Sequence, residues 1–130
     1  MQRTFFSTAS ILGAIAVMLG AFGAHILKEK LSPELLSTFE TGVRYQFYHV
    51  IALFIAGIVM KESKNKFLQY AGISFIIGIL FFSGSLYLIS THEIIGLTNY
   101  KWLGPVTPIG GLFLIAGWIC MFSAVLKKTE

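Results

Sequence analysis

Four apolar stretches, each about as long as a membrane span, constrain this sequence more than any other feature. They cover residues 5–24, 43–60, 67–90 and 105–126. A helix needs roughly 20 predominantly apolar residues to cross a hydrocarbon core of about 30 Å. Only 12% of the residues are charged, which is about half of the ~25% typical of soluble domains. The sequence therefore predicts an all-α integral membrane protein, a single domain over residues 1–130 built as a bundle of four transmembrane helices.

The basic residues indicate an orientation rather than a nucleic-acid partner. The net charge is +4, but the Lys and Arg residues lie between or beyond the apolar stretches, and no basic stripe with interleaved aromatic residues is present. Cytoplasmic loops of membrane proteins carry an excess of Lys and Arg. Six of the ten lie on the side of the termini and four on the other side; the six are Arg3, Lys61, Lys64, Lys66, Lys127 and Lys128. We predict a multi-pass protein of the bacterial cytoplasmic membrane with both termini in the cytoplasm.

Small residues form a stripe along the first span. They recur at spacings of four, three, four and three, which places them on one helix face: Ala9, Gly13, Ala16, Gly20 and Gly23. In lipid, small residues let two helix backbones approach closely. The stripe therefore predicts a helix-packing surface, either inside the bundle or between two copies of the chain.

The loop after the first span contains a helix start. Ser32 suits the N-cap, Pro33 the first helical position and Glu34 the first turn. An unbroken helix from residue 33 to residue 60 would measure about 42 Å, which exceeds the hydrocarbon thickness. The sequence therefore predicts an interfacial amphipathic helix over residues 33–41, a break at Gly42 and then the second span, with Glu40 and Arg44 as an i,i+4 ion pair.

Polar residues gather at the end of the spans that lies away from the termini. Ionisable groups inside a membrane are costly and suggest function. The candidate pocket consists of His25, Arg44, Gln46, His49, Ser83, Ser85, Tyr87 and Thr107. Each also has a simpler explanation, because an Arg can extend to the headgroups and a Ser can bond its own helix backbone.

Helical spacing predicts how this pocket is arranged. Gln46 and His49 share one face of the second span, and Ser83 and Tyr87 share one face of the third, whereas Ser85 is turned away by about 200°. Thr107 closes the pocket at the start of the fourth span, whose helix N-terminus offers free N–H groups. Together with Arg44, this arrangement suits an anion such as a carboxylate or a lipid phosphate.

Four motifs occur in order along the chain. They are GAFGAH (residues 20–25), F-x-TGV-x-YQ-x-YH (39–49), FSGSLY (82–87) and GP-x-TPIGG (104–111), followed by Trp118. With them the chain resembles family 423 of the domains of unknown function, small four-span bacterial membrane proteins similar to vertebrate transmembrane protein 256. The resemblance implies four spans and no established activity. The family's marked positions correspond here to His25, Thr41, Gly42, Gln46, His49, Ser83, Ser85, Tyr87, Thr107 and Pro108.

Three classes of function are compatible with the sequence. The first is a binding or assembly module whose outer pocket takes an anion, a lipid headgroup or a partner membrane protein. The second is a small transporter that acts as an oligomer with His49 as proton carrier. The third is a metal- or haem-binding membrane enzyme, although the three histidines lie in different elements and lack ligand spacing. We expect no cofactor, catalytic residue or metal site, and we expect membrane lipids, a second copy or another membrane protein as partners.

Overall fold

The computed structural model describes residues 1–63 and 65–127, and within them every regular element is helical. Lys64 and Lys128, which contribute to the charge count above, lie outside the described residues. Four helices are long and apolar enough to cross a membrane, as the sequence predicts. The elements are α1 (Gln2–Phe22), η1 (Gly23–Leu27), α2 (Lys28–Lys30), α3 (Pro33–Val59), α4 (Lys66–Thr91), η2 (Lys101–Leu103) and α5 (Val106–Leu126).

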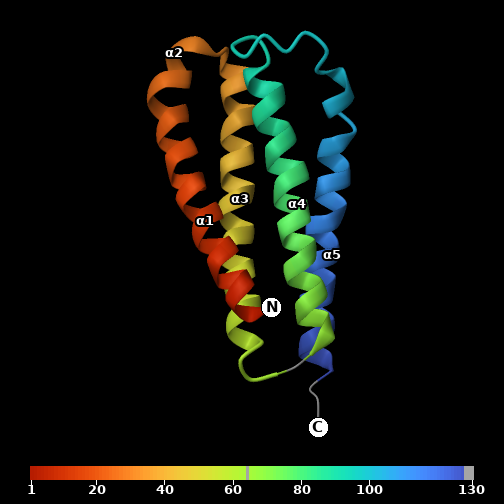
Figure 1. Cartoon of the computed structure of the whole chain (residues 1–130). Coiled ribbons are helices and arrows are strands. Elements are labelled where there is room, and N and C mark those ends of the chain that lie inside the picture. Colours follow the sequence, from red (N-terminus) through yellow and green to blue (C-terminus); the bar gives the residue numbers. More distant parts are fainter. Residues whose placement is uncertain (64, 128–130) are drawn as a thin grey trace.

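The long helices run up and down beside one another (Figure 1). Helix α1 packs on α3, α3 on α4, and α4 on α5, so α1 and α5 flank the α3–α4 pair on either side. The start of α1 and the end of α5 lie toward the same end of the bundle, as an even number of spans requires. We call the opposite end, which carries α2, residues 92–100 and η2, the distal end.

The predicted break at Gly42 is wrong, because α3 continues unbroken from Pro33 to Val59 over 27 residues. The helix start is as predicted, since the Ser32 hydroxyl accepts a hydrogen bond from the Leu35 amide at 3.3 Å. Gly42 serves packing instead, because a Cβ there would lie 2.8 Å from Cε1 of Tyr87. Residues 33–41 are therefore the first turns of one continuous helix of about 40 Å, which is longer than the hydrocarbon thickness, and they do not form a separate helix.

The first span is also longer than predicted, and it contains an unexpected π-helical turn. The helix continues through η1 and α2 to Lys30, which makes 29 residues from Gln2. In η1 the Lys28 amide donates to the Gly23 carbonyl oxygen, an i to i−5 bond that defines a π-helix. His25 donates from Nδ1 to the Ala21 carbonyl oxygen at 2.9 Å. The π-turn begins at Gly23, which lies against the ring of Phe39 in α3.

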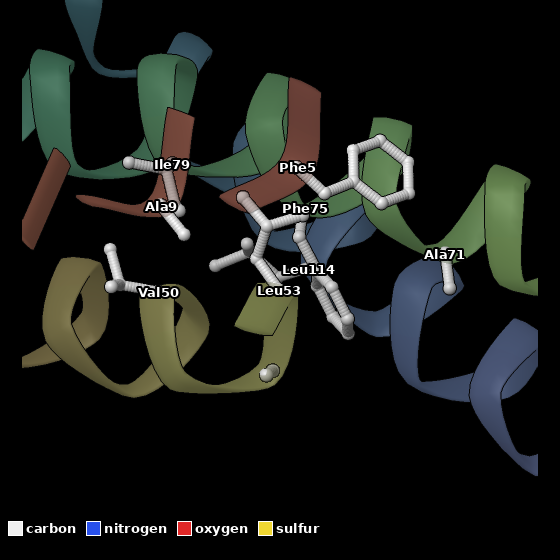
Figure 2. Close-up of a cluster of buried hydrophobic side chains, with 9 residues drawn as sticks. Phe5, Ala9, Val50, Leu53, Ala71, Phe75, Ile79 and Leu114 are labelled. Atoms are coloured by element: carbon white, nitrogen blue, oxygen red, sulfur yellow. The ribbon is translucent and has the colours of Figure 1, made fainter. Parts of the chain in front are cut away.

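The apolar core joins all four spans. Figure 2 shows Phe5 and Ala9 of α1, Val50 and Leu53 of α3, Ala71, Phe75 and Ile79 of α4, and Leu114 of α5. Glycines make room for the rings: a Cβ at Gly117 would lie 2.5 Å from Phe75, and one at Gly72 would overlap Phe5. Because apolar surface gains little by leaving lipid, this close packing holds the helices together.

The two outer helices approach their neighbours differently. A Cβ at Gly110 of α5 would overlap the backbone nitrogen of Phe82 in α4, so these two helices touch backbone to backbone. On α1, a Cβ at Gly13 would meet only the Val50 side chain, at 3.4 Å, and one at Gly20 only the Val43 side chain, at 3.5 Å. The pair α1–α3 is therefore separated by side chains, whereas α4–α5 is not.

The small-residue stripe faces α3 of the same chain. Its alanines, Ala9 and Ala16, are buried. At its distal end a Cβ on Gly23 would lie 3.1 Å from the ring of Phe39 in α3. The stripe thus faces α3 of the same chain, with Gly13 and Gly20 half-buried against it.

Candidate functional site

Gln46 connects three helices through its buried amide. Its Nε2 donates to the Leu12 carbonyl oxygen of α1 at 2.7 Å, and its Oε1 accepts from the Tyr87 hydroxyl of α4 at 2.7 Å. Only 2% of Gln46 is exposed. In hydrocarbon an unpaired amide is costly, so this side chain fixes α3 against both neighbours.

Two serines of α4 form hydrogen bonds to different neighbouring helices. The Ser83 hydroxyl donates to the Gly42 carbonyl oxygen of α3 at 2.7 Å. Ser85 and Thr107 of α5 share a hydrogen bond of 2.6 Å between their hydroxyl oxygens. The rotation of about 200° between the serines, predicted from helical spacing, therefore sends one to α3 and the other to α5.

His49 binds across the bundle to α5. Its Nδ1 lies 2.7 Å from the Tyr45 carbonyl oxygen, and the Trp118 indole donates to its Nε2 at 3.1 Å. An indole N–H only donates and a carbonyl only accepts, so the ring is neutral with its hydrogen on Nδ1. Both ring nitrogens of His49 are thereby engaged.

The polar residues at the distal end consequently form separate helix contacts and not one shared pocket. The structure brings Gln46 to Tyr87, Ser83 to the backbone of α3, and Ser85 to Thr107. His49 meets Trp118 instead of the serines or Tyr87. Within the described residues, no buried side-chain nitrogen or oxygen lacks a hydrogen-bond partner. The hydrogen bonds of these side chains therefore serve to hold the helices together.

Arg44 and His25 lie outside this buried set. Both side chains are exposed, and His25 bonds only its own helix. Arg44 donates from Nη2 to the Thr41 hydroxyl at 3.3 Å. Its predicted ion pair with Glu40 is not formed, since within residues 1–63 and 65–127 the one close contact between a basic and an acidic side chain joins Nε2 of His92 to Oε1 of Glu93, at 3.8 Å.

An open groove lies beside Arg44, between the distal parts of α1 and α3. It has a volume of about 190 Å³ and is lined by Gly20, Gly23, Phe39, Glu40, Val43 and Arg44. The two glycines come from the small-residue stripe, and Gly23 begins the π-turn. The groove therefore has apolar walls and two charged residues of opposite sign at its edge.

Sequence reasoning missed two polar anchors. Trp118 stood out only as part of a motif, and its partner His49 is 69 residues away, so no local pattern could pair them. Asn65 caps α4 through the Phe67 amide at 2.9 Å and donates to the Ala124 and Lys127 carbonyl oxygens, both at 3.2 Å. An Asn directly before an apolar run is a recognised capping signal and would have identified the first of these roles.

The histidines do not assemble a metal centre in the described part of the chain. No group of three or more His, Cys, Asp or Glu side chains there is placed to hold a metal ion. His92 stacks on Tyr100, with 3.8 Å between the ring centres, while His49 is held by Trp118. The metal or haem hypothesis gains no support from this geometry.

Comparison with known proteins gives consistent matches along most of the chain. The family model described as "Protein of unknown function (DUF423)" matches residues 19–111. A UPF0382 membrane protein of Staphylococcus haemolyticus is 42% identical over 121 residues, which cover 90% of this chain and 93% of the relative. The UPF0382 membrane protein YwdK of Bacillus subtilis is 37% identical over 127 residues, 97% of this chain and 98% of the relative. No solved structure matches significantly.

Proposed function

This chain belongs to the DUF423 family of membrane proteins, and we propose that it is a lipid-binding module whose site is the groove between α1 and α3. The observation that carries the proposal is the exposed Arg44 at the edge of that groove. Its guanidinium has no acidic partner in the described residues. An Arg side chain near the end of a membrane span can extend to the headgroup region, where lipid phosphates would provide a counter-ion.

The chemistry of the groove suits a phospholipid. An Arg guanidinium recognises phosphate through paired N–H donors. The walls are apolar, formed by Val43 and Phe39 together with Gly20 and Gly23. Glycines there leave space that any larger side chain would fill, so the upper part of an acyl chain fits beside a phosphate held by Arg44.

The buried hydrogen bonds support the site indirectly. Gln46, two residues after Arg44, binds α3 to both α1 and α4. By holding the helices in one arrangement, such contacts give a preformed groove, and a preformed site loses less free energy on binding. The buried polar residues accordingly keep the helices in the arrangement that forms the groove.

We propose that the groove opens to the outer leaflet. This orientation rests on the positive-inside rule, which favours the side of the termini as cytoplasmic. The relatives are bacterial membrane proteins by name, which supports the cytoplasmic membrane as the location. The distal end would then face outward.

The other functions have weaker support. A proton carrier needs a ring nitrogen that can be reached by a proton, whereas both nitrogens of His49 already bond Tyr45 and Trp118. A homo-oligomer built on the small-residue stripe is less well supported, because the stripe faces α3 of the same chain. Neither alternative explains the groove.

Native mass spectrometry of the detergent-purified protein tests the proposal. We expect the wild-type protein to retain a phospholipid and the Arg44→Gln variant to lose most of it. The matched control is Arg3→Gln, because Arg3 is also exposed but lies at the opposite end of the bundle. Equal lipid retention by wild type and Arg44→Gln would contradict the proposal.

A further inference from the structure

We infer, building on the proposed lipid site, that the groove selects phospholipids whose headgroup carries an amine with N–H donors beyond the phosphate. The inference comes from the second charged residue of the groove, Glu40. Its carboxylate lines the same groove as Arg44 and is exposed. The site therefore offers a cation and an anion together.

The two charges are close in sequence yet do not neutralise each other. A Glu four residues before an Arg is the favourable order for a helical ion pair. Here Arg44 donates to Thr41 instead, at 3.3 Å, and the described residues contain no ion pair involving Glu40. Both groups remain available for a ligand that carries charges of both signs.

Their order along α3 matches the order of charges in such a headgroup. Helix α3 begins at the distal end, so Glu40 lies farther from the middle of the membrane than Arg44, by about 6 Å at 1.5 Å per residue. In a phospholipid the phosphate lies nearer the hydrocarbon, and a headgroup amine lies farther out. The order of the two side chains along α3 thus matches a phosphate at Arg44 and an amine at Glu40.

Glu40 also provides a reason for selectivity. A primary ammonium donates N–H hydrogen bonds to a carboxylate, and a charge-assisted bond of this kind is among the stronger ones. A trimethylated ammonium has no N–H to donate. A glycerol headgroup brings no positive charge to Glu40 and leaves the net negative charge of the lipid beside it.

Competition between three lipids tests the inference on the full-length protein. The protein is mixed in detergent with equal amounts of phosphatidylethanolamine, phosphatidylcholine and phosphatidylglycerol, and retained lipids are counted by native mass spectrometry. We expect phosphatidylethanolamine to be enriched about fivefold over each of the others. Glu40→Gln should reduce that ratio to near one while total phospholipid retention persists through Arg44.

The matched control is Glu34→Gln, since Glu34 is also an exposed acidic residue of α3 but does not line the groove. This control should keep the wild-type preference. Equal retention of the three lipids by the wild type, or an unchanged preference in Glu40→Gln, would overturn the inference. The proposed function would still stand in that case if Arg44→Gln reduces total retention, and loss of both effects would refute both.

Discussion

The indole N–H of Trp118 in α5 donates to Nε2 of His49 in α3, with 3.1 Å between the two nitrogens. Together with the Tyr45 carbonyl at Nδ1, this bond holds His49 in one neutral tautomer. The ring is also packed between aromatic side chains, with its centre 5.6 Å from that of Phe75. His49 therefore acts as a structural connector between α3 and α5.

Replacing Trp118 with Phe should lower the free energy of unfolding by about 1 kcal/mol, since the buried Nε2 loses its donor while the ring is largely kept. Thermal unfolding in detergent micelles measures the effect. Trp102→Phe is the control, because Trp102 is 57% exposed and its indole makes no hydrogen bond within the described residues. A Trp118→Phe protein as stable as Trp102→Phe would show that the bond contributes nothing.

Gly110→Ala should destabilise the protein by about 1–3 kcal/mol, the usual cost of overpacking. Its Cβ would overlap the Phe82 backbone and lie 2.8 Å from the Phe81 carbonyl carbon, so α4 and α5 would have to separate. Gly84→Ala is the matched control, because a Cβ there meets nothing within 4 Å. Similar melting temperatures for the two variants would contradict backbone contact between α4 and α5.

The Gln46–Tyr87 bond can be measured with a double-mutant cycle of Gln46→Leu and Tyr87→Phe. We expect a coupling energy of about 0.6 kcal/mol and no more than about 1.7 kcal/mol, which are the average and the maximum found for hydrogen bonds between membrane helices. Tyr70→Phe serves as the control, since Tyr70 is 55% exposed, and it should be additive with Gln46→Leu. Additivity in the Tyr87 cycle would show that the two side chains do not interact energetically.

Asn65→Ala should destabilise by about 1–2 kcal/mol, because the α4 cap and the bonds to the end of α5 are lost together. Asn99→Ala provides the comparison, since Asn99 is exposed in the connection before η2. Denaturant unfolding of the two variants under identical conditions decides the matter. Equal midpoints would mean that water satisfies the α5 carbonyls equally well.

Cysteine labelling tests the orientation. In a Cys120→Ser background, Thr98→Cys at the distal end should react with a membrane-impermeant maleimide on whole cells, because Thr98 is exposed. Glu62→Cys, in the connection near the termini, should react only after permeabilisation. The reverse pattern would place the groove in the inner leaflet.

The fold was largely predictable because span length is a property of composition. Four apolar runs of sufficient length define four helices regardless of how they pack. The ends of the helices were less predictable, since a membrane helix can continue beyond the apolar run until a residue interrupts its backbone hydrogen bonds. The sequence predicts a break at Gly42, but glycine is tolerated inside membrane helices, and here it accommodates Tyr87.

The sequence predicts the depth at which the polar residues of the candidate site lie, but not which of them form hydrogen bonds with one another. The positions of Gln46 and Tyr87 near the same end of their spans predict a shared depth, and the structure joins the two side chains. The partners Leu12 and Trp118 could not be inferred, because they depend on how the helices are rotated about their axes. That rotation is set by contacts such as Gly110 on Phe82, which involve residues far apart in the sequence.

The unequal spacing of the outer helices has a consequence for motion. Helix α5 meets α4 backbone to backbone at Gly110, whereas side chains such as Val43 and Val50 separate α1 from α3. Local opening is cheapest where the fewest close contacts must be broken, so we expect α1 to open from the bundle more readily than α5. The groove lies between α1 and α3, so a bound lipid would suppress this opening. Hydrogen exchange of the backbone amides of α1 would then be slower in the lipid-bound protein than in the lipid-free protein.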